Sequence, residues 1–320
     1  MGVFKRFARP VILAAARREG LRRAAERLPV TRQVMRRFVP GESIADVMSS
    51  VEQLRDSKRM VSIDYLGEDV TDVAAADATV DAYLSLLEAF SARSDVVAAV
   101  HPLEVSLKLS ALGQALPQDG EKIALENARV ICDRAQRAGV WVTVDAEDHT
   151  TTDSTLAIVR DLRADFDWVG TVLQAYLKRT HADCAEFAAT GARIRLCKGA
   201  YDEPASVAYR DRDAVADSYL RCLGVLMGGS GYPMVASHDP AIIAAVPALL
   251  RENGRSVGDF EYQMLYGIRE GEQRRLAEEG NNVRVYVPFG TQWYGYFVRR
   301  LAERPANFTF FLRALAERRR

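Results

Sequence analysis

Eight short apolar runs, each followed by a stretch with helical spacing, recur through most of the chain and restrict its fold more than any other feature. The apolar runs lie at residues 60–68, 103–112, 140–148, 167–176, 192–201, 231–239, 259–267 and 282–290. Their length and composition are typical of buried strands in a parallel sheet. Eight strand–helix units over about 245 residues match the size of one (β/α)₈ barrel, and an open doubly wound sheet is the alternative.

The segments between these runs are predicted to be helices. They lie at residues 69–90, 121–139, 151–162, 181–191, 205–228, 239–253, 270–280 and 291–303. Gly139, Gly191 and Gly280 stand where a glycine commonly ends a helix, because glycine adopts the left-handed conformation without strain. The sequence therefore predicts an α/β protein with an N-terminal helical arm (1–58), a barrel domain (59–305) and a C-terminal helical tail (306–320).

Composition limits the partners and the location of this chain. Its 320 residues are 48% hydrophobic and 27% charged, which allows a sizeable core. Residues 1–40 hold eleven basic and two acidic side chains, so the remainder is net acidic, and nucleic acid is not an expected partner. The four cysteines show no metal-ligand spacing and fit reduced thiols in the cytoplasm. No apolar run reaches the roughly 18–20 residues that a membrane span needs.

The basic arm has two interpretations. It lies on an anionic membrane surface or docks a partner, or it packs the apolar side around residues 11–13 against the barrel. We favour packing, because the amphipathic pattern is irregular. A cytoplasmic location with peripheral contact at the inner face of the cell membrane is the expectation.

The stretch 282–304 combines a strand, a break and a helix. Pro288 and Gly290 end the strand, and helical spacing then puts Tyr296, Arg299 and Arg300 on one face. Two adjacent guanidinium groups on a rigid element form a socket for a carboxylate or a phosphate. A solvated basic helix end is the alternative interpretation.

Polar side chains end every predicted strand, where a barrel enzyme carries its active site. These are Asp64, Glu68, Lys108, Asp145, Glu147, Gln174, Arg195, Lys198, His238, Gln263, Tyr266 and Tyr286. Together they predict an anion-binding pocket that also contains carboxylates, and therefore an enzyme.

Three chemistries fit such a pocket. Asp145, Glu147 and His149 alternate and would bind a divalent metal, but the neighbouring lysines and arginines disfavour it. Lys108 or Lys198 would form a Schiff base in a barrel lyase or aldolase. The third chemistry is that of a redox cofactor held by Arg, Lys, Gln and His. A Rossmann site or a nucleotide-triphosphate loop is not supported, since neither glycine motif occurs.

Six segments decide among these chemistries. They are RLCKGAY (195–201), YQMLYGIRE (262–270), VRVYVPFGTQWYGYFVRRLAE (283–303), SLKLSAL (106–112), VDAED (144–148) and QAY (174–176). In order and in position they resemble the signature segments of the proline dehydrogenase family, over roughly residues 60–305. The resemblance implies a distorted (β/α)₈ barrel that binds FAD and oxidises L-proline to Δ1-pyrroline-5-carboxylate, with a quinone as electron acceptor. That reaction is the first step of proline catabolism to glutamate.

The resemblance also assigns residues by motif position. Arg299 and Arg300 would clamp the substrate carboxylate, with Lys108, also a substrate-binding residue, near it. Leu265, Tyr286 and Tyr296 would wall the proline ring. Asp145 and Arg195 occupy catalytic positions, and Glu68 would pair with Arg299 to gate the site. The cofactor positions are Ala146, Gln174, Arg195, Lys198, Gly199, Ala200, Ser237 and His238. No metal is implied.

Two departures from the family pattern point to a monofunctional enzyme. Gln292 stands where many bifunctional members have His, and Cys197 replaces the usual Val. At 320 residues the chain also lacks room for an aldehyde dehydrogenase half, so a separate pyrroline-5-carboxylate dehydrogenase is expected to take the product.

Overall fold

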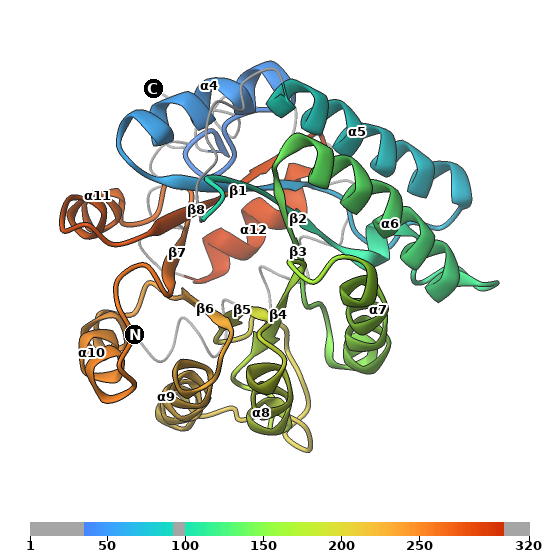
Figure 1. Cartoon of the computed structure of the whole chain (residues 1–320). Coiled ribbons are helices and arrows are strands. Elements are labelled where there is room, and N and C mark those ends of the chain that lie inside the picture. Colours follow the sequence, from blue (N-terminus) through green and yellow to red (C-terminus); the bar gives the residue numbers. More distant parts are fainter. Residues whose placement is uncertain (1–34, 92–99, 304–320) are drawn as a thin grey trace, which may run out of the picture.

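The structure, a computed structural model, is a closed barrel of eight parallel strands (Figure 1). It describes residues 35–91 and 100–303, the side chains of Arg299 and of residues 301–303 excepted. The strands are β1 (Met60–Tyr65), β2 (Leu103–Leu107), β3 (Trp141–Val144), β4 (Gly170–Gln174), β5 (Arg193–Cys197), β6 (Tyr232–Ala236), β7 (Glu261–Leu265) and β8 (Val283–Phe289). Each strand pairs with the next, and β8 closes against β1. The predicted barrel is confirmed, and the doubly wound sheet is wrong.

The helices, most of which surround the barrel (Figure 1), follow the predicted segments closely. They are α4 (Ile44–Asp56), α5 (Val73–Ser91), α6 (Gly120–Ala138), α7 (Thr152–Asp165), α8 (Thr180–Ala189), α9 (Arg212–Gly228), α10 (Pro240–Glu252), α11 (Glu270–Glu278) and α12 (Trp293–Glu303), with short 3₁₀ turns η2 (Leu109–Leu112) and η3 (His149–Thr151). The helix predicted from residue 205 is wrong over 205–211. Asp211 caps α9, because its Oδ1 accepts bonds from the amides of Asp213 and Ala214 at 3.0 and 3.1 Å.

Apolar and polar residues alternate along the strands, and the polar ones face the barrel interior. In β1, Val61 and Ile63 belong to the apolar core, whereas Ser62 and Asp64 are buried polar residues. Arg195 of β5 donates to Ser62 of β1 at 3.1 Å, although these strands are not neighbours. This bond crosses the interior, because successive side chains of a strand point to opposite faces. The apolar core therefore lies between the barrel and its helices.

A buried ion pair closes the end of the barrel where the strands begin. Arg284 Nε lies 2.7 Å from Glu261 Oε1, and both side chains are 0% exposed. The remaining N–H groups of Arg284 donate to the carbonyl oxygens of Val61 and His101, at 3.1 and 2.9 Å. The guanidinium thus stabilises a carboxylate that water cannot reach.

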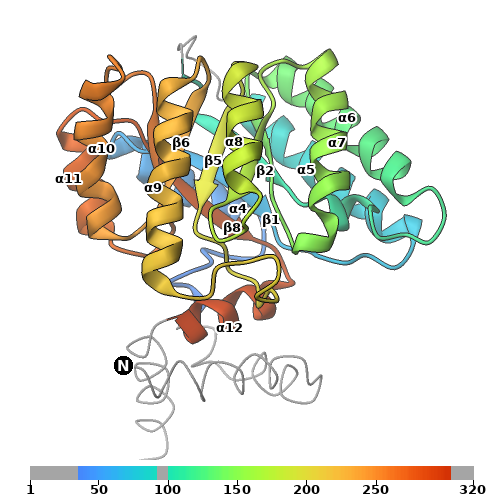
Figure 2. The same cartoon turned by 90° about the horizontal axis from the view of Figure 1, so that it is seen from below.

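Helix α12 lies across the other end of the barrel rather than beside β8, from which it continues (Figure 2). α4 takes the place beside β1 and β8 in the outer ring. The rings of Phe38 and Phe297 pack with centroids 6.5 Å apart, and Trp293 Nε1 donates to Glu42 at 2.9 Å. The segment 35–42 therefore holds α12 over the barrel.

The expected N-terminal arm is described only from residue 35 onward. α4 lies within this arm and is helical as expected, whereas residues 1–34 and the expected tail 306–320 lie outside the described residues. Among the helices that the structure describes, none is both long and apolar enough to span a bilayer. The boundaries of arm, barrel and tail stay predictions.

Replacing Arg284 with Met leaves Glu261 buried without its cation. We expect the free energy of unfolding, measured with urea, to fall by about 3–5 kcal/mol. The double variant Arg284→Met/Glu261→Met removes both charges and should recover most of this loss, because no unpaired charge is then buried. The control Arg275→Ala, which breaks exposed pairs on α11, should cost less than about 1 kcal/mol. A double variant as unstable as the single one would contradict this explanation.

Candidate active site

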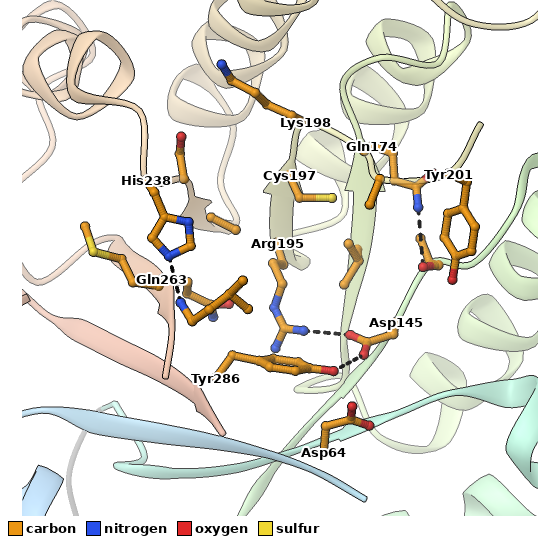
Figure 3. A pocket seen from close by; sticks show the side chains of 18 of the residues that line it. Asp64, Asp145, Gln174, Arg195, Cys197, Lys198, Tyr201, His238, Gln263 and Tyr286 are labelled. Atoms are coloured by element: carbon orange, nitrogen blue, oxygen red, sulfur yellow. Dashed lines mark hydrogen bonds and ion pairs between the residues drawn. The ribbon is translucent and has the colours of Figure 1, made fainter. Parts of the chain in front are cut away.

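A cavity of about 610 Å³ lies at the carboxyl ends of the strands, and Tyr296 and Arg300 of α12 also line it. Figure 3 shows part of this lining. All eight strands, or the loops directly after them, contribute to its lining. The predicted site residues that line it are Glu68, Lys108, Asp145, Ala146, Gln174, Arg195, Lys198, Gly199, Ala200, Ser237, His238, Leu265, Tyr286, Tyr296 and Arg300. The side chain of Arg299, the one other predicted residue, is not among those that the structure describes.

Arg195 connects the cavity to the barrel interior. Its Nη1 donates to Asp145 Oδ1 at 2.6 Å and to Ser106 Oγ at 2.8 Å. Its Nη2 donates to Glu104 Oε1 at 2.7 Å and to Ser62 Oγ at 3.1 Å. The guanidinium is held from four sides and is only 5% exposed, so it is a fixed positive charge at the cavity floor (Figure 3).

Lys108 forms a second buried cation beside Arg195. Its Nζ lies 2.6 Å from Asp64 Oδ2 and 3.7 Å from Asp145 Oδ2. Tyr286 OH donates to the same Asp145 oxygen at 2.9 Å. Burial alone would lower the pKa of Lys108, but the carboxylates of Asp64 and Asp145 raise it above its ordinary value. Lys108 is therefore an ammonium group in the neutral pH range.

The side-chain amide of Gln174, at the end of β4, has hydrogen-bond partners for its nitrogen, whereas its oxygen has none among the described residues. Its Nε2 donates to the carbonyl oxygens of Ala146 and Glu147, at 3.4 and 3.0 Å. Its Oε1 is buried and has no hydrogen-bond partner among the described residues. A buried acceptor in a cavity wall fits a ligand that donates an N–H to it.

Gly199 has a backbone that only glycine tolerates at this point. Its φ is +102°, and a Cβ there would lie 2.1 Å from the ring of Tyr176. The ring of Tyr176 thus packs directly on the Gly199 backbone. The cavity is lined at this point by Gly199, Ala200 and Tyr201. This segment can approach a planar or phosphate-bearing ligand without side-chain interference.

The β6 side of the cavity carries an imidazole and a lysine. The amide of Leu265 donates to His238 Nε2 at 2.9 Å, so the ring proton lies on Nδ1 (Figure 3). Lys198 Nζ lies 2.6 Å from Asp239 Oδ2, and this hydrogen bond lowers the pKa of Asp239. Both predicted cofactor residues therefore have defined orientations at the cavity edge.

The three residues of the metal alternative have separate partners. Asp145 binds Arg195, Glu147 accepts from Ser110 N at 3.1 Å, and the ring of His149 contacts Glu203. They do not converge on one point. Within residues 35–91 and 100–303, no three His, Cys, Asp or Glu side chains are arranged to hold a metal ion.

Several residues at the site were not predicted. Ser62, Glu104 and Ser106 position Arg195 from below, and Glu203 holds loops beside Gly199. The signal for the first three is the polar residue at every second strand position. Further lining residues outside the predicted set are Asp64, Val172, Cys197, Tyr201, Ala236, Asp239, Pro240, Gln263 and Met264, of which Asp64 and Gln263 stand among the strand-end residues.

A closed parallel barrel with fixed cations and carboxylates around a cavity at the strand ends defines a (β/α)₈-barrel enzyme. The family model of proline dehydrogenase matches residues 47–313. The chain belongs to the proline dehydrogenase family, and it is an oxidoreductase. The family resemblance predicted from the sequence is confirmed.

Relatives of known name agree over most of the chain. The proline dehydrogenase of Deinococcus radiodurans is 41% identical over 281 residues, which cover 87% of this chain and 89% of that protein. Proline dehydrogenase 1 of Bacillus subtilis strain 168 is 38% identical over 290 residues, 90% of this chain and 92% of that protein. Among solved structures, proline utilization A (PutA) from Bdellovibrio bacteriovorus inactivated by N-propargylglycine has a TM-score of 0.77 at 25% identity, over 85% of this chain and 32% of that one.

Glu147 makes the stability of the site depend on pH. Burial raises the pKa of Glu147 from 4.5 to about 7, although hydrogen bonds from Ser110 oppose the rise. The folded protein thus holds this proton more tightly than the unfolded chain does. The stability that the carboxyl contributes is present below about pH 4.5 and is lost as the pH rises through about 7.

Glu147→Gln imitates the protonated acid and should remove this dependence. When the pH is raised from about 5 to about 8, the free energy of unfolding of the variant should increase relative to that of wild type by about 2 kcal/mol. Urea unfolding at both pH values measures the difference, and Glu121→Gln on the exposed side of α6 is the control. The same difference between variant and wild type at both pH values would contradict the assignment.

Proposed function

We propose that this protein oxidises L-proline to Δ1-pyrroline-5-carboxylate with bound FAD and passes the electrons to a quinone. The observation that carries the proposal is the convergence of family-motif residues on one cavity, from segments as far apart as residue 68 and residue 300. The cavity has the volume of a typical small-molecule or cofactor site. A separate pyrroline-5-carboxylate dehydrogenase would take the product onward to glutamate.

The substrate carboxylate would bind at the α12 side of the cavity. Arg300 lies with its Cζ 5.0 Å from the centroid of the Tyr296 ring, which restricts the guanidinium. Lys108 brings a second positive charge from β2. A zwitterionic amino acid needs its carboxylate fixed, and charge-assisted bonds to Arg and Lys do this more strongly than neutral donors. Arg299 would supply a further guanidinium.

The proline ring would lie between apolar walls. Leu265, Tyr286 and Tyr296 reach the cavity from β7, β8 and α12. Tyr286 is held by its bond to Asp145, and burial raises its pKa, so the phenol stays neutral. Such walls exclude water and restrict the ring to one orientation, which is what a hydride transfer requires of the protein.

FAD would bind along the side of the cavity formed by the ends of β4, β5 and β6. Gln174 has a buried acceptor to offer, and the Gly199–Ala200 backbone allows close approach. Ala146, Lys198, Ser237 and His238 complete the set of residues that would hold it. Bound FAD would supply the acceptor for the hydride that leaves the ring carbon next to nitrogen. Arg195, a buried and fixed cation, would stabilise negative charge on the reduced cofactor.

For the reaction to balance, the substrate ammonium group would lose one proton to solvent before or during the loss of the hydride from the ring carbon. Asp145 takes part by holding Arg195 and Tyr286 in place, at 2.6 and 2.9 Å. Glu68, which lines the cavity, would pair with Arg299 to close the site.

We infer a cytoplasmic protein that contacts the inner face of the membrane to reach the quinone.

The Schiff-base alternative has less support. Both candidate lysines, Lys108 and Lys198, lie 2.6 Å from a carboxylate oxygen. A Schiff base forms from a neutral amine, whereas the carboxylates of Asp64 and Asp145 raise the pKa of Lys108 and favour its charged form. Lys108 is therefore a poor nucleophile, and the amine of Lys198 is engaged by Asp239.

An absorbance spectrum of the purified protein tests the proposal. We expect flavin bands near roughly 370 and 450 nm that bleach when L-proline is added without oxygen. Bands that ignore L-proline would move the substrate to another secondary amine. A colourless protein that FAD does not reconstitute would overturn the proposal and favour the lysine chemistry.

Arg300→Ala should weaken substrate binding. Loss of a charge-assisted contact costs about 2–4 kcal/mol, which raises the KM for L-proline roughly 30- to 1000-fold. Steady-state kinetics with a soluble quinone measure it, and Arg275→Ala is the control. Arg300→Lys keeps the charge without the planar guanidinium, so its KM for L-proline should lie between those of wild type and Arg300→Ala. An unchanged KM in Arg300→Ala would exclude the carboxylate role.

A further inference from the structure

A buried carboxylate lies beside the cavity without lining it. Glu203, in the loop between β5 and α9, is 6% exposed. Its Oε1 accepts from the amide of His149 at 3.0 Å and from Tyr176 OH at 3.3 Å, and its Oε2 contacts His149 Nδ1. The three donor groups come from the loops that follow β3 and β4. One carboxylate therefore joins three consecutive loops at the strand ends.

Burial of a carboxylate is costly unless its hydrogen bonds are satisfied. Here the two oxygens of Glu203 have three donors, and the backbone carbonyl of Glu203 accepts from Arg210 Nη1 at 2.9 Å. Glu203 has no atom in the cavity lining, and its bonds run to the two neighbouring loops. The arrangement fixes the position of backbone segments rather than touching a ligand.

The segment that Glu203 fixes is a wall of the cavity. The Tyr176 ring packs on Gly199, where a Cβ would lie 2.1 Å from the ring. Tyr176 N also donates to Lys198 O at 2.9 Å, so this residue supports the start of the loop twice. Tyr201, two residues before Glu203, lines the cavity. Residues 199–201 are thus held at one end by Tyr176 and at the other by Glu203.

We propose that Glu203 is a positioning residue for the cofactor side of the site, acting through Tyr176 and the 199–201 backbone. The inference rests on the proposed function, because FAD is the ligand assigned to that wall. Glu203 does not reach the substrate side, where Lys108 and Arg300 lie. Its loss should therefore weaken FAD binding without changing the binding of L-proline.

The test compares Glu203→Ala, Glu203→Gln and the control Asp202→Ala. Asp202 is the exposed neighbour, with a side chain 84% exposed. FAD dissociation constants of the apoproteins are measured by quenching of flavin fluorescence. We expect Glu203→Ala to weaken FAD binding about tenfold or more, since three donors lose their acceptor. Glu203→Gln keeps an acceptor oxygen and should lose less than about threefold. Asp202→Ala should match wild type.

Two further measurements separate positioning from general stability. At saturating FAD, the KM for L-proline of Glu203→Ala should stay within about twofold of wild type. Tyr176→Phe keeps the ring on Gly199 but loses one bond to Glu203, and it should weaken FAD binding about threefold. This variant also serves if Glu203→Ala does not fold.

The outcomes are distinguishable. FAD binding as tight as wild type in Glu203→Ala, or in Tyr176→Phe where the alanine variant does not fold, overturns the inference. An increase in the KM for L-proline equal to the loss of FAD affinity overturns it as well, because it shows a general effect. A wild-type protein that does not bind FAD overturns the proposed function, and the inference falls with it.

Discussion

The buried ionic network inside the barrel is the constraint on which the site depends. Four acidic residues, Asp64, Glu104, Asp145 and Glu261, are paired with four basic ones, Lys108, Arg193, Arg195 and Arg284. Charges in such an interior must be matched, because a single unpaired one costs several kcal/mol. A slip of one residue in a strand that carries one of these charges would turn that charge into the apolar layer. The network therefore requires the register that brings the strand ends together.

Helix α12 covers the cavity at whose base the ionic network lies. Had α12 packed beside β8, as helices of a regular barrel do, Tyr296 and Arg300 would lie on the outer surface. Instead α4 covers β1 and β8, and the contacts of Phe38 and Glu42 with α12 hold it across the barrel. The segment before the first strand is thus part of what forms the site, although it contributes no residue to the cavity lining.

The sequence predicted the strands and helices well, because the spacing of apolar residues that indicates each of them involves only residues close together in the chain. All eight strands were predicted, since each run carries buried residues between turn signals, and family motifs placed fifteen of the lining residues. Long-range pairing was not predictable in this way. Glu104 meets Arg195 across 91 positions of sequence, and Glu203 meets His149 across 54. Residues 205–211 have helical spacing, yet their backbone follows the β4–α8 loop, where Lys178 N donates to Val207 O at 2.9 Å.

The same pairing decides which chemistry the site can support. Lys108 and Arg195 are cations at the cavity floor whose charge is already balanced by Asp64, Asp145 and Glu104. A paired lysine is a weak nucleophile, and a guanidinium keeps its positive charge near neutral pH. Neither group is suited to form a covalent intermediate, but both are suited to orient a charged substrate. The oxidation that we propose needs a cofactor to accept the electrons, and in that proposal the buried Gln174 acceptor and the open Gly199 backbone would contact it.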